Sequence, residues 1–209
     1  MKFDIITIFP EIFDSFKNEA LIARAQKKKI ISINTHFLRD YTDDAHKSVD
    51  DRPYGGGPGM LLKVEPIFKA VSELKKKGGK SKVILFSPRG KKLDQKMVKK
   101  LSKAGRLILI CGRYEGVDER VADHIADEVI SIGDFVLSGG EVPAMVLTEA
   151  VSRMIPGVVG KEESAQKMDH AQYTRPEIFE AGSKKWKVPK VLLSGDHKKI
   201  EEWRKKHTK

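Results

Sequence analysis

The chain has 209 residues, of which 40% are hydrophobic and 33% charged, a composition typical of a folded globular protein and not of a disordered one. A single cysteine, Cys111, excludes an intramolecular disulfide, and no run comes near the roughly 18 apolar residues of a membrane-spanning helix, so we expect no membrane partner. The formal net charge of +11 and a pI near 9.6 favour a polyanionic partner, most often a nucleic acid.

Short β-rich apolar runs alternate along the chain with segments of helical period. In chain order, we expect a strand at 3–9, a helix to about 28, a strand at 30–37, a helix at 65–76, a strand at 82–86, a helix at 94–103, a strand at 107–111, a short helix at 118–126, a strand at 128–132 and a helix at 142–155. This alternation predicts an α/β fold, with a mostly parallel sheet covered by helices on both faces.

The pattern changes after Pro156-Gly157. We therefore expect a first domain at 1–159, a polar linker at 160–172 and a short basic domain at 173–209 that ends in a helix from Asp196. Positive charge gathers in two runs, with 13 Lys and Arg against one acid at 75–106, and ten against three at 184–209. One such run is as consistent with a solvated helix face as with a binding surface, but two on a small chain favour RNA.

Three glycine-bearing loops follow expected strands, at 87–90, 112–116 and 131–141. In open parallel sheets ligands bind at the carboxyl ends of the strands, and glycines let the backbone approach a ligand closely. Any one of these loops is explained by a tight turn alone, whereas three on neighbouring strands indicate a ligand site. Neither phosphate-cradle motif is present, which argues against a dinucleotide enzyme or a P-loop NTPase. The six histidines show no metal-ligand spacing.

The longer motifs resemble one known family. Residues 50–60 (DDRPYGGGPGM), 111–120 (CGRYEGVDER) and 131–141 (SIGDFVLSGGE) closely resemble the bacterial tRNA (guanine-N1)-methyltransferases, the TrmD family. Residues 173–177 (YTRPE) and 191–197 (VLLSGDH) match as well, and the resemblance runs from residue 1 to about 204.

The resemblance implies a fold of the SPOUT class, with a deep trefoil knot in the carboxyl half of the sheet and a small C-terminal helical domain that binds tRNA. It also implies a homodimer with active sites at the subunit interface and a cytoplasmic location. The implied reaction is tRNA modification, in which S-adenosyl-L-methionine methylates N1 of the guanosine 3′ of the anticodon. A magnesium requirement stays open, with no ligands assigned.

Guanine N1 carries a proton at neutral pH, so the reaction needs a base near N1 and a cation or donor near O6. The resemblance places the O6 partner at Arg153, which is otherwise explained as a helix C-terminal residue that complements the dipole. It places the base in the linker, whose only Asp is Asp169, with Glu162 or Glu163 as the alternative. The donor-binding residues that it implies are Phe86, Ser87, Pro88, Gly112, Tyr114, Glu115, Gly116, Ile132, Gly133, Leu137, Gly139, Gly140 and Pro143.

The chain departs from the family pattern in its shortened linker, in a tail that ends soon after residue 204 and in Arg89, where many relatives have Gln. Two other functions therefore stay open. One is a related knotted RNA methyltransferase with a different target base, and the other is an RNA-binding module that has lost its chemistry.

Overall fold

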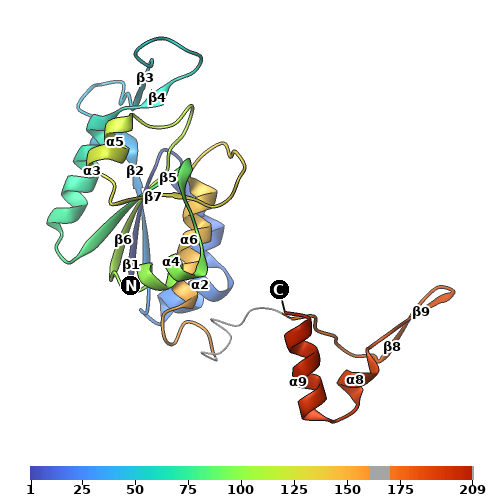
Figure 1. The fold of residues 1–209 in the computed structure, drawn as a ribbon. Helices are drawn as coiled ribbons and strands as arrows, with labels where there is room; N and C mark the ends of the chain where they lie inside the picture. Colours follow the sequence, from blue (N-terminus) through green and yellow to red (C-terminus); the bar gives the residue numbers. More distant parts are fainter. Residues whose placement is uncertain (161–169, 209) are drawn as a thin grey trace. The chain divides into compact units, whose positions relative to one another are not determined.

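The computed structural model describes residues 1–160 and 170–208, which belong to two compact units. The first unit is an α/β structure with one five-stranded sheet (Figure 1). Every neighbouring pair in this sheet is parallel, and the strand order is β2-β1-β6-β5-β7. The strands are β1 (Lys2–Thr7), β2 (Ser32–Phe37), β5 (Ser81–Lys92), β6 (Arg106–Ile110) and β7 (Glu128–Ser131).

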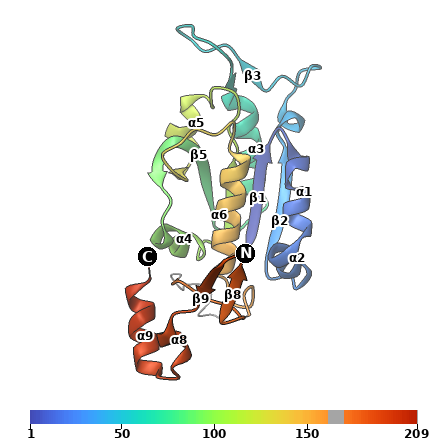
Figure 2. The same cartoon turned by 90° about the vertical axis from the view of Figure 1, so that its right-hand side faces the viewer.

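Helices cover both faces of this sheet because successive strand residues point to opposite sides and both sides are apolar. Ile5 belongs to the core beneath η1 (Pro10–Phe13), α1 (Asp14–Asn18), α2 (Ala20–Lys27), α4 (Gln95–Leu101) and α6 (Glu141–Arg153). Ile6 belongs to the opposite core, beneath η2 (Leu38–Tyr41), α3 (Val64–Lys76) and α5 (Glu119–His124). Figure 2 shows α6 running along the sheet near β1. The predicted α/β fold with a parallel sheet is confirmed.

A buried ion pair ties the sheet together near the start of its central strands. Asp4 and Arg106 are only 2% and 5% exposed, and the Arg106 Nε donates to Asp4 Oδ2 over 2.7 Å. His36 Nε2 lies 2.8 Å from Asp4 Oδ1, and Arg106 Nη1 donates to the carbonyl of Leu74 at the end of α3. Burial acts to raise the pKa of Asp4, but the hydrogen bonds from His36 and Arg106 outweigh it and lower that pKa.

Two element boundaries differ from the prediction. The expected helix up to about residue 28 is broken into η1, α1 and α2, with Ala20 at φ +48° between the last two. The strand expected to stop at 86 bulges at 87–90 and then pairs again with β7 through Lys91 and Lys92. Gly90 permits this return because a Cβ there would lie 2.6 Å from the backbone nitrogen of Ile130.

The loop at 52–60 is closed at its base by a short antiparallel pair, β3 (Asp50–Asp51) and β4 (Leu61–Leu62). Two backbone bonds join its last part to the loop after β6, from Glu115 N to Met60 O and from Leu62 N to Gly116 O, each 3.0 Å. Tyr54 at the tip is fully exposed. The loop is therefore free at its tip and fixed where it meets the carboxyl edge of the sheet.

The second unit contains an antiparallel hairpin of β8 (Ile178–Ala181) and β9 (Lys184–Lys187), followed by α8 (Lys190–Leu193) and α9 (His197–Lys206). α9 begins after Asp196, whose carboxylate accepts from the backbone of Lys199 as an N-cap, so this helix is confirmed. The expectation of a purely helical unit was wrong because it missed the hairpin. Nowhere in 1–160 or 170–208 does a helix combine the length and apolarity needed to cross a membrane.

Candidate functional site

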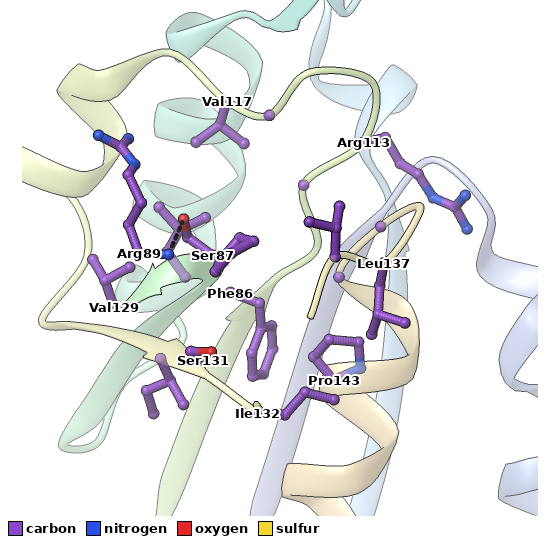
Figure 3. A pocket seen from close by; sticks show the side chains of 18 of the residues that line it. Phe86, Ser87, Arg89, Arg113, Val117, Val129, Ser131, Ile132, Leu137 and Pro143 are labelled. Atoms are coloured by element: carbon purple, nitrogen blue, oxygen red, sulfur yellow. Dashed lines mark hydrogen bonds between the residues drawn. The ribbon is translucent and has the colours of Figure 1, made fainter. Parts of the chain in front are cut away.

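The three glycine-bearing loops meet around one cavity at the carboxyl edge of the sheet. They follow β5, β6 and β7, and because the strand order is β6-β5-β7 the loops are neighbours in space. The cavity has a volume of about 570 Å³ (Figure 3), within the range usual for small-molecule sites. All the residues that the sequence assigned to donor binding line it, namely Phe86, Ser87, Pro88, Gly112, Tyr114, Glu115, Gly116, Ile132, Gly133, Leu137, Gly139, Gly140 and Pro143.

Close backbone packing joins the loop after β7 to the loop after β6. Gly140 N donates to Gly112 O over 2.9 Å. A Cβ on Gly140 would lie 2.6 Å from the Cα of Cys111, and the neighbouring atoms are all backbone, so nothing there can move aside cheaply. Glycine is therefore required at this position by the crossing of two chain segments.

The turn after β6 is held in an unusual conformation. Tyr114 has φ +61° and Gly116 has φ +126°, and the turn closes with a bond from Gly116 N to Arg113 O of 3.0 Å. A positive φ at a tyrosine is uncommon, and such strain persists where surrounding contacts over-determine the backbone. Here those contacts are the backbone bonds to Met60 and Leu62. The turn presents backbone groups to the cavity in a fixed arrangement.

A buried charge network fixes the same two loops from behind. Glu141, the first residue of α6, is 1% exposed and accepts hydrogen bonds from Thr7 Oγ1 over 2.7 Å and from Arg113 Nε over 2.8 Å. The Arg113 guanidinium also lies 4.6 Å from the ring centroid of Phe9. Figure 3 shows the Arg113 side chain directed away from the cavity. One carboxylate therefore joins the end of β1, the loop after β6 and the start of α6.

The walls of the cavity combine apolar side chains with backbone polar groups. Figure 3 shows Phe86, Ile132, Leu137 and Pro143 lying around the hollow. The Arg89 guanidinium, also in the lining, is paired with the carboxylate of Glu119, so its charge is neutralised locally. Such walls suit a ligand with a flat aromatic part and polar groups that the backbone can bind.

Cys111 does not serve as a nucleophile in this arrangement. It is 1% exposed, and burial, with a further contribution from Glu141, raises the pKa of its thiol well above its ordinary value. The neutral thiol packs in the core, as expected for a buried cysteine at the end of a strand.

The residues assigned to proton transfer are not at this cavity. Arg153 is the last residue of α6, and it is absent from the lining of the cavity. Pro143, which does line the cavity, lies ten residues earlier on the same helix, about 15 Å along its axis. Asp169, Glu162 and Glu163 lie outside the described residues. Among the residues that are described, no three His, Cys, Asp or Glu side chains form a group able to hold a metal ion.

Sequence reasoning missed Arg113 and Glu141 as residues that shape the site. Both stand beside a glycine that it did single out, Gly112 and Gly140, and a charge next to a loop glycine was the available signal. It also missed four other lining residues that come from the same loop after β7, which are Ser131, Phe135, Val136 and Ser138.

Comparisons with known proteins agree with the motifs. A family model described as tRNA (Guanine-1)-methyltransferase TrmD matches residues 1–209. A Dictyoglomus turgidum protein named tRNA (guanine-N(1)-)-methyltransferase is 52% identical over 99% of this chain and 84% of its own length. Proteins of the same name from Ruminiclostridium cellulolyticum and Dehalococcoides mccartyi are 50% and 47% identical, over 98% and 100% of this chain and 89% and 86% of their own lengths.

Proposed function

Because the chain belongs to the tRNA (guanine-1)-methyltransferase TrmD family, we propose that it methylates N1 of the guanosine 3′ of the anticodon in tRNA, with S-adenosyl-L-methionine as the donor. The observation that carries the proposal is the gathering of every donor-binding residue expected from the sequence around one cavity. Cytoplasmic action and a SPOUT-type knot belong to the same proposal. The knot is supported by the close crossing of the backbone at Gly140 over Cys111 and Gly112.

The cavity fits this donor. Its apolar walls suit an adenine ring, and its loop backbone offers hydrogen bonds without the glycine pattern of a phosphate site. Glu115 supplies a carboxylate in the lining, on the side of the clamp to the 52–60 loop, and Arg89 is neutralised by Glu119. When bound, S-adenosyl-L-methionine supplies a sulfonium methyl group that a nucleophilic nitrogen accepts.

The chain's own residues must make guanine N1 nucleophilic. We assign Asp169 as the base that takes the N1 proton, with Glu162 or Glu163 as the alternative. We assign the Arg153 guanidinium to O6, where negative charge develops as the proton leaves. Both roles require these groups to reach a base held over the donor cavity.

The position of Arg153 supports a site built from two chains. In its own chain this residue lies about 15 Å along α6 from the part of the helix that lines the cavity. A second copy of the chain supplies an Arg153 from another direction. We therefore propose a homodimer in which each active site takes residues from both subunits.

Nucleoside analysis tests the proposed reaction. Unmodified tRNA is incubated with the protein and donor, digested and examined for 1-methylguanosine at the position 3′ of the anticodon. A different methylated nucleoside would favour a related RNA methyltransferase. Binding of tRNA with no methylated product would favour an RNA-binding module. Calorimetry in metal-free buffer checks the donor site, and no heat of binding at millimolar donor would contradict it.

Mixed dimers test the two-chain site. An Arg153→Ala chain is combined with an Asp169→Ala chain, each inactive as a homodimer. If the two residues meet across the interface, one of the two sites in the mixed dimer keeps both of them, and activity partly returns. No recovery in verified mixed dimers would place both residues of a site on one chain.

A further inference from the structure

The hairpin of the second unit carries an exposed aromatic pair. Phe179 of β8 and Trp186 of β9 are directly opposite each other in the antiparallel register, with ring centroids 5.6 Å apart. They are 51% and 62% exposed. Large exposed rings that gather at one place mark a binding surface more often than a bare structural hairpin, because solvated aromatic area is unfavourable.

Lysines surround this pair on both faces of the hairpin. Side chains alternate along a strand, so Lys184 shares the face of Trp186, while Lys185 and Lys187 lie on the other. Lys185 is paired with Glu180 over 3.1 Å. Lys184 and Lys187 make no ion pair with any residue of the described ranges. The unit at 170–208 holds ten Lys and Arg against five Asp and Glu, a formal charge of +5.

A single-stranded nucleic acid fits this combination better than another protein does. Unpaired bases stack on exposed aromatic side chains, and nearby lysines neutralise the phosphates on either side. A protein partner is disfavoured because lysine is depleted in protein interfaces, and here lysines surround the rings. A duplex hides the faces of its bases within the stack, so the occupant is an unpaired stretch.

We propose that this hairpin binds an unpaired nucleotide of the tRNA substrate, with the base stacked on Trp186 and adjoining phosphates near Lys184 and Lys187. The inference rests on the proposed function for the identity of the RNA. It adds an RNA contact that is separate from the donor cavity, because all the residues of the hairpin belong to the second unit.

Fluorescence gives the direct test. The chain has two tryptophans, Trp186 and Trp203. In a Trp203→Phe variant Trp186 is the sole emitter, and unmodified tRNA should quench it in a saturable way. The matched reporter is Trp186→Phe, which leaves only Trp203 and should respond less. Unchanged Trp186 emission at saturating tRNA would overturn the stacking contact.

Affinity for tRNA separates stacking from packing. Trp186→Phe keeps an aromatic face, while Trp186→Leu keeps apolar bulk without one. Stacking of one base contributes about 5- to 150-fold in affinity, so the Leu variant should weaken tRNA binding by that factor and the Phe variant by much less. Circular dichroism of each variant confirms that the unit is folded. Equal affinity of the Leu variant and the wild type would refute the proposal.

Salt dependence tests the phosphate contacts. Replacing Lys184 and Lys187 with Gln should lower the slope of log affinity against log salt by about 0.7 for each phosphate lost from a single strand. The control replaces Lys27 and Lys28, two exposed lysines of the first unit, and makes the same change in net charge. A smaller slope change in the hairpin variant than in the control would contradict the contacts.

Two further readouts keep this inference separate from the proposed function. Failure of the wild-type protein to form 1-methylguanosine would overturn the function, whatever the hairpin does. Normal product formation with unchanged tRNA affinity in Trp186→Leu would overturn the hairpin proposal alone. If the pair instead packs against a second copy, the Leu variant should weaken the dimer in sedimentation and tRNA should not quench Trp186, which would also overturn it.

Discussion

Replacing Glu141 with Gln should loosen the donor cavity without touching its lining. Gln keeps the shape of the side chain but removes the charge that Arg113 and Thr7 share. Removing one partner of a buried ion pair typically costs about 3–5 kcal/mol. The Arg113 side chain is 19% exposed while that of Glu141 is 1% exposed, so solvent screens part of the loss and we expect about 2–3 kcal/mol.

Thermal unfolding and donor binding measure this effect. A loss of that size lowers the melting temperature by roughly 4–12 °C in a chain of this length. Donor affinity should fall as well, because Glu141 joins the loop after β6 to the start of α6. Glu65→Gln, at an exposed position on α3, is the matched control and should change stability by less than about 0.5 kcal/mol.

The outcome that would refute this reasoning is equally specific. If Glu141→Gln melts within a degree of the wild type and binds donor equally well, the network does not hold the loops. A double variant, Arg113→Met with Glu141→Gln, sharpens the test. It should cost less than the sum of its single changes, because no uncompensated charge is left buried.

Three further predictions concern other parts of the molecule. Asp4→Asn should destabilise the fold by about 3–5 kcal/mol, since it leaves Arg106 buried without its carboxylate. Because the folded-state pKa of Asp4 is lowered, this advantage of the wild type is complete above the ordinary carboxyl pKa and disappears as pH falls through the folded value, which urea unfolding across pH measures. Gly140→Ala should cost about 1–3 kcal/mol or more and weaken donor binding in calorimetry, whereas Gly160→Ala, where a Cβ meets no atom within 4 Å, should do neither. Asp169→Asn should lower turnover by about 10²- to 10⁴-fold with donor affinity unchanged; normal turnover there, with a loss on changing either linker Glu, would move the base.

The donor cavity was predictable because its signals are local. Each loop carries its own glycines directly after a strand, and the parallel sheet brings those loops together once β5 lies between β6 and β7. The hairpin was missed although its signal was also local. Gly182-Ser183 stands between two short segments, and Gly182 takes φ +62° at the turn, as two-residue hairpins require.

The network behind the cavity was not predictable from local pattern. Thr7 and Glu141 are 134 positions apart in the sequence, and neither belongs to a motif that names the other. Their contact depends on how α6 begins against the end of β1, which periodicity does not specify. The same holds for Asp4 and Arg106, which are 102 positions apart.

The exposed side of α6 gives the two-chain proposal a geometric form. Val142 and Val146 are 49% and 43% exposed, and Arg153 follows Val142 by eleven residues, close to three helical turns, so all three share one side of the helix. A two-fold interface is self-complementary, so a contact made by one end of this stripe is also made by the same end of its partner. If the stripe packs antiparallel against its copy, the partner's Arg153 comes to the Val142 end, which is the end that lines the donor cavity through Pro143. The same helix would then hold the donor with its first turn and serve the second site with its last. An Arg153→Lys variant should therefore lower turnover while donor affinity stays unchanged, because an ammonium lacks the guanidinium fork.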